Sequence, residues 1–185
     1  MDYFAPFDDG VFRCEQIIAY TFKSKAICAE ALNAAGDYRS VCAVDGTYHH
    51  IPKNDRLATY GDIAASLQLC GLWLELGVQN GGPRLADALA AVIDEAPDFW
   101  PTIQGEVLGH SNLAEVGGRC GLYHCINAKT SHVPITPTMI GKTVSAVLGA
   151  VDRDGGHEAL CRVMDRLGLR QHNLLPKADV ATKSK

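Results

Sequence analysis

Two acidic side chains, Asp55 and Asp62, are spaced so that both would face one side of a helix, with Ala58 between them at the i+3 position. Hydrolysis of a phosphodiester with Mg²⁺ needs several oxygen ligands held close together, because a hard divalent cation is bound by carboxylates and water. This face offers two carboxylates and, at Ala58, a residue that supplies no ligand. The question is therefore whether other acids complete such a site.

The stretch from Asn54 to Asp62, Asn-Asp-Arg-Leu-Ala-Thr-Tyr-Gly-Asp, resembles the signature helix of ribonuclease III domains, which reads Asn-Glu-Arg-Leu-Glu-Phe-Leu-Gly-Asp. Further segments are similar to that family in the same order, within the range Phe12 to Leu169. They are Ile17–Lys23 with Ala31-Leu32, Asn112–Glu115 with Gly121-Leu122, Thr143–Val151, and Asp154-Gly155-Gly156. The order of these motifs is far more specific than any one of them.

The resemblance implies an all-α domain that forms a two-fold dimer around the signature helix and leaves a valley for duplex RNA. It also implies a metal site of four acids from two helices, at the positions of Ala58, Asp62, Lys142 and Ser145 in this chain, whereas Asp55 matches an auxiliary acid. Only Asp62 keeps its carboxylate. Because a lysine amine at a ligand position repels a cation over a few ångströms, metal binding of the family type is not expected.

Lys142 has two interpretations. It can neutralise the remaining acid of a lost metal site through a salt bridge to Asp62, which we favour. Alternatively, it contacts an RNA phosphate, or acts as a base with a lowered pKa in a different reaction. The sequence leaves these alternatives open.

Histidines and cysteines suggest two further candidate sites. Cys120 and Cys125 lie near His110, His124 and His132, but the pair has no second ligand pair at a spacing typical of zinc sites, so helix packing is favoured. His49-His50 precedes the signature helix and could line the same cleft as Asp62, although a solvated loop pair is favoured.

Apolar periodicity predicts helices over residues 12–20, 24–35, 54–77, 83–96, 110–120, 137–151 and 156–168. Thr136 is predicted to cap the penultimate helix, with Pro137 in its first turn. We expect one domain over residues 12–169 with an insertion at 79–105, an extension at 1–11 and a flexible tail at 170–185. No appended double-stranded-RNA-binding domain is expected.

Composition narrows the function classes. The 185 residues carry a net charge of −4, so strong binding to nucleic acid would need a local basic patch. Seven cysteines, most of them in apolar helical patterns, predict buried reduced thiols in a cytoplasmic or nuclear protein. The sequence predicts no transmembrane helix, signal peptide or transit peptide.

Three functional hypotheses follow. The first is a domain unable to cleave RNA, retained for binding structured RNA or for pairing with another protein in RNA processing or in a ribonucleoprotein, with a homodimer expected. The second is a metal-independent enzyme that uses Lys142, Ser145 and Asp62 for acid–base chemistry on a small molecule. The third is an active nuclease with relocated ligands, which alone would need Mg²⁺ as cofactor.

Overall fold

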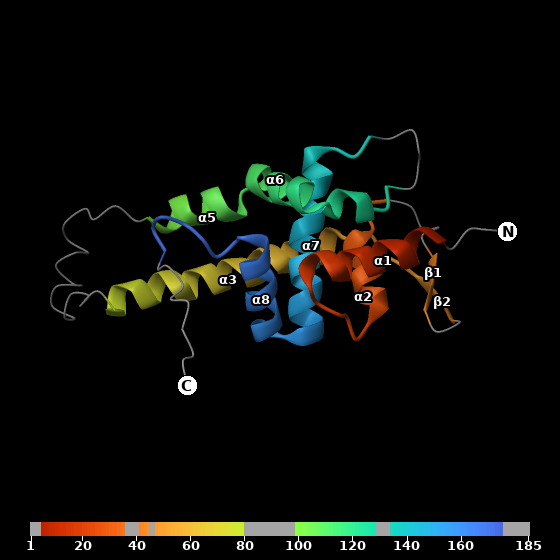
Figure 1. The fold of residues 1–185 in the computed structure, drawn as a ribbon, viewed down its shortest axis with the longest axis horizontal. Coiled ribbons are helices and arrows are strands. Elements are labelled where there is room, and N and C mark those ends of the chain that lie inside the picture. The colour runs from red at the N-terminus through yellow and green to blue at the C-terminus, as the bar shows by residue number, and fades with distance from the viewer. Residues whose placement is uncertain (1–4, 36–40, 45–46, 80–98, 129–133, 176–185) are drawn as a thin grey trace.

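The computed structural model describes residues 5–35, 41–44, 47–79, 99–128 and 134–175, and these residues form a helical domain with one small hairpin (Figure 1). The hairpin pairs β1 with β2 in antiparallel register, Val41 opposite His50. The helices are α1 (Ala5–Ile18), α2 (Lys25–Leu32), α3 (Asp55–Gln79), α5 (Trp100–Leu108), α6 (His110–Cys120), the 3₁₀ turn η1 (Leu122–Cys125), α7 (Pro137–Gly155) and α8 (His157–Leu167); the strands are β1 (Val41–Val44) and β2 (Thr47–His50).

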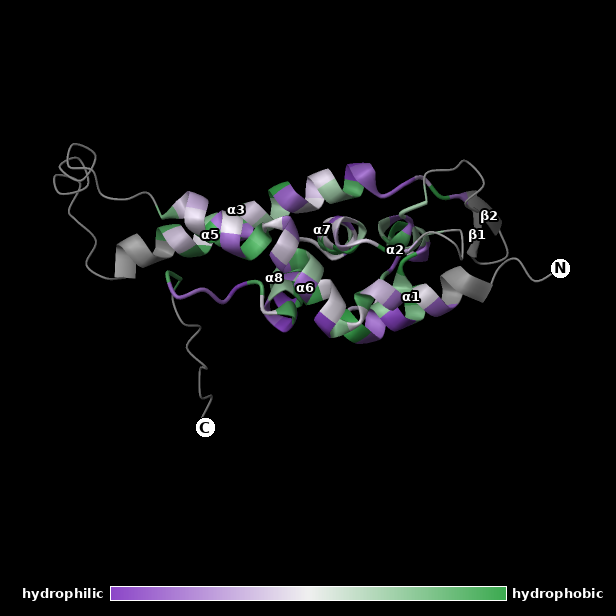
Figure 2. Ribbon diagram, turned by 90° about the horizontal axis from the view of Figure 1, so that it is seen from above, coloured by the Kyte–Doolittle hydropathy of each residue, from purple (hydrophilic) through white to green (hydrophobic). Residues whose placement is uncertain are grey.

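Helix α7 is the centre of the core. Every residue from Thr143 to Val151 is buried, and α7 packs against α2, α3, α6 and α8. Figure 2 shows α7 almost end-on, with α3 on one side and α1, α6 and α8 on the other. A helix that is apolar around most of its circumference is stable only when neighbours cover all its sides, which explains this central position.

Two glycines allow α3 and α7 to cross at close range. A Cβ atom on Gly61 would lie 1.9 Å from the carbonyl oxygen of Ser145, and one on Gly149 would lie 2.4 Å from the carbonyl oxygen of Leu57. Contacts this short with backbone atoms exclude any side chain at either position. The crossing therefore fixes the distance between the two helices that carry the candidate site.

A buried polar network fixes the start of α3. The side-chain amide of Asn54 donates hydrogen bonds to the carbonyl oxygen of Ala31 at 3.0 Å and to the Thr143 hydroxyl at 3.3 Å. The side-chain amide of Asn33 donates to the carbonyl oxygens of Ile51 and Pro52. Because buried polar groups need partners, this network ties the connection before α3 to α2 and α7.

The all-α prediction is confirmed, and the Thr136 cap is present, with its hydroxyl accepting a hydrogen bond from the Met139 backbone N–H at 3.3 Å.

Three features differ from the prediction. Helix α1 begins at Ala5, the chain before α3 forms the hairpin, and α5, with Pro101 in its first turn, lies where no helix was predicted. A proline is tolerated there because the first turn needs no N–H donor. The helix predicted at 83–96 lies outside the described residues.

The first residues of the predicted tail, 170–175, are described and pack on the domain. Leu175 is buried against the core, and the Arg170 guanidinium pairs with the carboxylate of Asp165 at 2.6 Å. Residues 170–175 therefore continue the packed domain. The remainder of the tail and most of the predicted insertion lie outside the part of the chain that the structure describes.

Candidate functional site

A cavity of about 320 Å³ opens between the first half of α3 and the first half of α7. It contains every position at which the sequence predicted a family site residue. Its lining residues are Asp55, Ala58, Thr59, Asp62, His110, Thr138, Lys142 and Ser145.

Asp55 is the centre of charge at the mouth of this cavity. Its carboxylate forms an ion pair with the amine of Lys142 and a second one with the amine of Lys53, at 3.3 Å. Hydrogen bonding to Lys142, supported by Lys53, holds the pKa of Asp55 below its usual value despite some burial. The carboxylate therefore stays ionised over the neutral pH range.

Asp62 lies deeper and does not form the salt bridge that the sequence suggested. Among the described residues, Lys142 pairs with Asp55 instead, and Asp62 forms no ion pair or hydrogen bond with them. Asp62 directly follows Gly61, at the tight crossing of α3 and α7, whereas Asp55 is exposed in the first turn of α3. A long lysine side chain keeps its amine hydrated by extending towards the exposed acid, which explains the choice of partner.

The other two family positions are closed to solvent. Ala58 is 4% exposed, and Ser145 is 1% exposed. The Ser145 hydroxyl donates to the Gly141 carbonyl oxygen at 3.4 Å, one turn back along α7. Neither residue presents a group to a ligand as the chain stands.

His110 and Thr138 are members of this cavity that sequence reasoning missed. His110 begins α6 and was considered only as a zinc ligand. Its position could have been inferred only from the packing of α6 on α7, where a Cβ on Gly141 would lie 2.8 Å from the His110 carbonyl oxygen. That contact depends on the small size of Gly141 in α7, so the sequence around His110 shows no pattern that predicts it.

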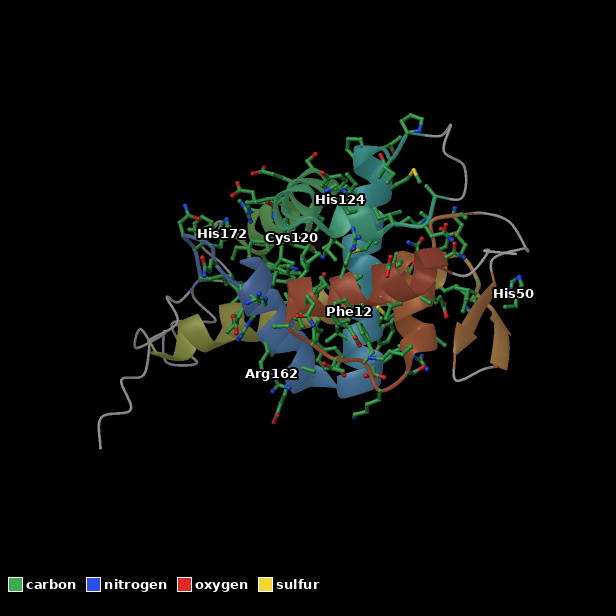
Figure 3. The ribbon with its side chains drawn as sticks, turned by 45° about the vertical axis from the view of Figure 1, so that its right-hand side comes forward. Phe12, His50, Cys120, His124, Arg162 and His172 are labelled. Carbon is green, nitrogen blue, oxygen red and sulfur yellow. The ribbon has the colours of Figure 1, made fainter. Side chains whose placement is uncertain are left out.

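The remaining histidine and cysteine candidates do not join the site. His50 lines a different cavity from Asp62. Figure 3 shows His50 beside the hairpin, well apart from Cys120 and His124. Within the described residues, no three His, Cys, Asp or Glu side chains are close enough to share a metal ion. The side chain of His49 and the whole of His132 lie outside what the structure describes.

The cysteines that the structure describes are free thiols, and those on the α1–α2 interface are fully buried. Hydrogen bonding to Cys28, together with burial, raises the pKa of Cys14 well above its usual value, and burial, with a smaller effect of Cys14, raises the pKa of Cys125 to about 12. Such thiols are unreactive core residues. The predicted packing role is therefore confirmed for Cys14, Cys28 and Cys125.

The side chains in the cavity do not fit two divalent cations. Among the described residues that line it, Asp55 and Asp62 are the only carboxylates, and Lys142 brings a positive charge to the same space. Mg²⁺ needs near-octahedral oxygen ligands, and a second ion would increase the repulsion from the lysine. We therefore derive no metal-dependent step from this cavity.

Comparison with solved structures identifies the architecture. Two structures of the nuclease domain of ribonuclease III from Campylobacter jejuni superpose with TM-scores of 0.59, at 17% and 18% sequence identity. The alignments cover 84% of this chain in both cases, and 92% and 93% of the Campylobacter domains. The chain has a ribonuclease III nuclease-domain fold. No protein-family model and no curated relative matches the sequence.

A ribonuclease III-like fold agrees with the order of sequence motifs noted above, because the signature segment forms the first half of α3 and Thr143–Val151 forms the centre of α7. The fold places these two segments against each other across the cavity. In the described part of the chain, no helix is long and apolar enough to cross a membrane.

Proposed function

We propose that this ribonuclease III-like domain does not cleave RNA by a two-metal mechanism and is retained for binding structured RNA or for pairing with a protein in RNA processing. The observation that carries the proposal is the ion pair between Lys142 and Asp55, inside a cavity where Asp62 is the only family ligand left. The amine of Lys142 neutralises the negative charge of the Asp55 carboxylate, as a bound metal ion would otherwise do.

One feature supports contact with an anionic polymer in particular. The side chains of Lys53 and Lys142 are both partly exposed, at 41% and 37%, and both pair with the one carboxylate of Asp55. Lysines of this kind contact phosphate groups as mobile point charges. The domain's overall negative charge would then confine RNA to this face.

The experiment is incubation of the purified protein with long duplex RNA in Mg²⁺ and in Mn²⁺, beside an active ribonuclease III. We expect no short duplex products from the wild type or from Asp62→Asn. Products that appear with the wild type and disappear with Asp62→Asn would refute the proposal. A triple variant, Ala58→Glu with Lys142→Asp and Ser145→Glu, tests whether restored acids create activity.

Binding is measured separately from cleavage. We expect the affinity for duplex RNA to fall with rising salt, and to fall further in Lys53→Gln and Lys142→Gln. Arg119→Gln on the exposed face of α6 removes the same charge away from the cavity and serves as the matched control. Equal affinity in all variants would exclude the cavity face as the RNA contact and leave protein pairing.

The proposed homodimer uses an exposed apolar stripe on α3, formed by Ile63, Leu67 and Leu74. Their side chains are 65%, 65% and 59% exposed, and the spacing places all three on one helix face. Large apolar side chains grouped on one face mark interaction surfaces. One of the Campylobacter structures describes flexibility in a region of that protein involved in dimer formation.

Analytical ultracentrifugation tests the homodimer. We expect the wild type to sediment as a dimer and Ile63→Asp with Leu67→Asp to sediment as a monomer, because two charges would be buried in an isologous interface. Phe12 on α1 is also strongly exposed, at 62%, so Phe12→Asp is the control (Figure 3). A monomeric wild type at all concentrations would refute self-pairing and favour a heterologous partner.

Acid–base catalysis on a small molecule is the second candidate, favoured by the presence of His110 beside Lys142 and Asp62 in one cavity. The ion pair with Asp55 argues against it, because the Lys142 amine is already engaged by that carboxylate and not by a substrate. A nuclease with relocated ligands has less support, because the described residues supply no replacement carboxylates to this cavity.

A further inference from the structure

A second and larger cavity, of about 610 Å³, lies on the opposite side of α3 from the candidate site. Helices α2, α3 and α7 and the segment between β2 and α3 form its walls. Its volume falls in the range of small-molecule sites, and nothing above assigns it a role.

Two arginines from different helices reach this cavity, Arg56 from the first turn of α3 and Arg153 from the last turn of α7. Neither guanidinium forms an ion pair or a hydrogen bond with any residue that the structure describes. The Arg153 guanidinium lies 5.9 Å from the centre of the Tyr60 ring, which limits its orientations. Two unpaired guanidinium groups facing one cavity are typical of phosphate recognition, since each can donate two parallel hydrogen bonds.

The same cavity has a further donor and an apolar wall. Ser24 is the N-cap of α2, yet its hydroxyl makes no capping hydrogen bond, so it is available to a ligand. The first turn of α2 begins beside it and adds the positive end of a helix dipole. Ile27, Ile51 and Leu57 form an apolar wall next to these donors. The cavity therefore combines an anion site with a surface for an organic group.

The nearby acids do not cancel this positive charge. Asp152 accepts a hydrogen bond from the Tyr60 hydroxyl at 2.6 Å, and Asp154 accepts hydrogen bonds from the Tyr20 hydroxyl and from the backbone of residues 23 and 24. Neither carboxylate lines the cavity. Glu30 does line it, and burial raises its pKa against the opposing effect of both arginines. Glu30 opposes one of the two arginines, so the described lining of the cavity keeps an excess of positive charge.

We propose that this second cavity binds a phosphate monoester, with Arg56 and Arg153 holding the phosphate and the apolar wall receiving the organic group. A phosphate monoester carries close to two negative charges at neutral pH, which matches the two guanidinium groups. The ligand is either a free phosphorylated small molecule or the 5′-phosphate end of an RNA strand. The proposal does not depend on the function assigned to the first cavity.

The test is isothermal titration calorimetry of the wild-type protein with adenosine 5′-monophosphate, inorganic phosphate and adenosine. We expect adenosine 5′-monophosphate to bind and adenosine to bind at least about tenfold more weakly, because the charge-assisted hydrogen bonds are lost. Equal binding of the two compounds, or no binding of either phosphate compound up to about 10 mM, would refute the proposal.

Matched variants locate the binding. Arg56→Gln and Arg153→Gln should each weaken binding about tenfold, and Glu30→Gln should strengthen it or leave it unchanged. Arg119→Gln, on α6, removes the same charge elsewhere and should have no effect. A loss of affinity in Arg119→Gln equal to that in Arg56→Gln would show non-specific attraction and overturn the assignment. Because both cavity arginines are exposed, their replacement should leave the melting temperature nearly unchanged.

A short RNA with a 5′-phosphate and its 5′-hydroxyl counterpart distinguish the two sources of the ligand. Tighter binding of the 5′-phosphorylated RNA than of adenosine 5′-monophosphate, lost in Arg153→Gln, would assign the cavity to RNA ends. Equal binding of the phosphorylated RNA and of the mononucleotide would assign it to a free small molecule.

Discussion

Replacement of Gly61 by alanine should destabilise the domain, although alanine is the better helix former. The added Cβ would lie 1.9 Å from the Ser145 carbonyl oxygen and 2.8 Å from the Gly149 backbone nitrogen. Backbone atoms cannot move aside by a rotamer change, so α3 and α7 must separate, which costs about 3 kcal/mol, the upper end for an overpacked core. Alanine regains about 1 kcal/mol of helix propensity. The expected net loss in the free energy of unfolding is about 2 kcal/mol.

Urea denaturation at a fixed protein concentration measures this loss. Gly71 lies in the same helix with no atom within 4 Å of an added Cβ, so Gly71→Ala is the matched control and should raise the free energy of unfolding by up to about 1 kcal/mol. A Gly61→Ala variant as stable as the wild type, beside a Gly71→Ala variant that behaves as expected, would refute the close approach of α3 and α7 at Gly61.

Three further outcomes are expected. Asp55→Asn should lower stability by at most about 1 kcal/mol, because the pair with Lys142 is half-exposed. Since the folded-state pKa of Asp55 is lowered, its contribution is present above about pH 4 and lost as the pH falls through the folded value, as urea denaturation at several pH values will measure. Asn54→Ala should cost about 2 kcal/mol in the same assay, because the Ala31 carbonyl oxygen loses a buried donor. Mg²⁺ should not raise the melting temperature beyond a sodium chloride control of equal ionic strength, and a rise lost in Asp62→Asn would refute our interpretation of the site.

The sequence predicts the helices that carry long apolar patterns, because their periodicity comes from the core face itself. Helix α7 shows this, since its buried run over Thr143–Val151 contains the motif on which the resemblance depends. Short or polar elements are harder to predict. The hairpin has four residues in each strand, and α5 contains Pro101, so neither has a pattern strong enough to outweigh the local turn signals.

The members of the site on α3 and α7 were predictable from spacing and from the resemblance, but the pairing of their side chains was not. Spacing placed Asp55, Ala58 and Asp62 on one face, and the structure places all three in one cavity. It could not show that Lys142 would reach Asp55, because that choice depends on where α3 and α7 cross and on which acid stays hydrated. The second cavity could not be predicted from the sequence either, because its two arginines, Arg56 and Arg153, lie far apart in the chain and no motif connects them.

Under the proposed function, this fold keeps its architecture without a metal site. The crossing at Gly61 and Gly149 and the buried hydrogen bonds of Asn54 depend on backbone and amide groups, so removal of carboxylates leaves them intact. Under the proposed function, Lys142 supplies from within the chain the positive charge that pairs with Asp55. A binding role elsewhere on α3 can then exist without disturbing the crossing.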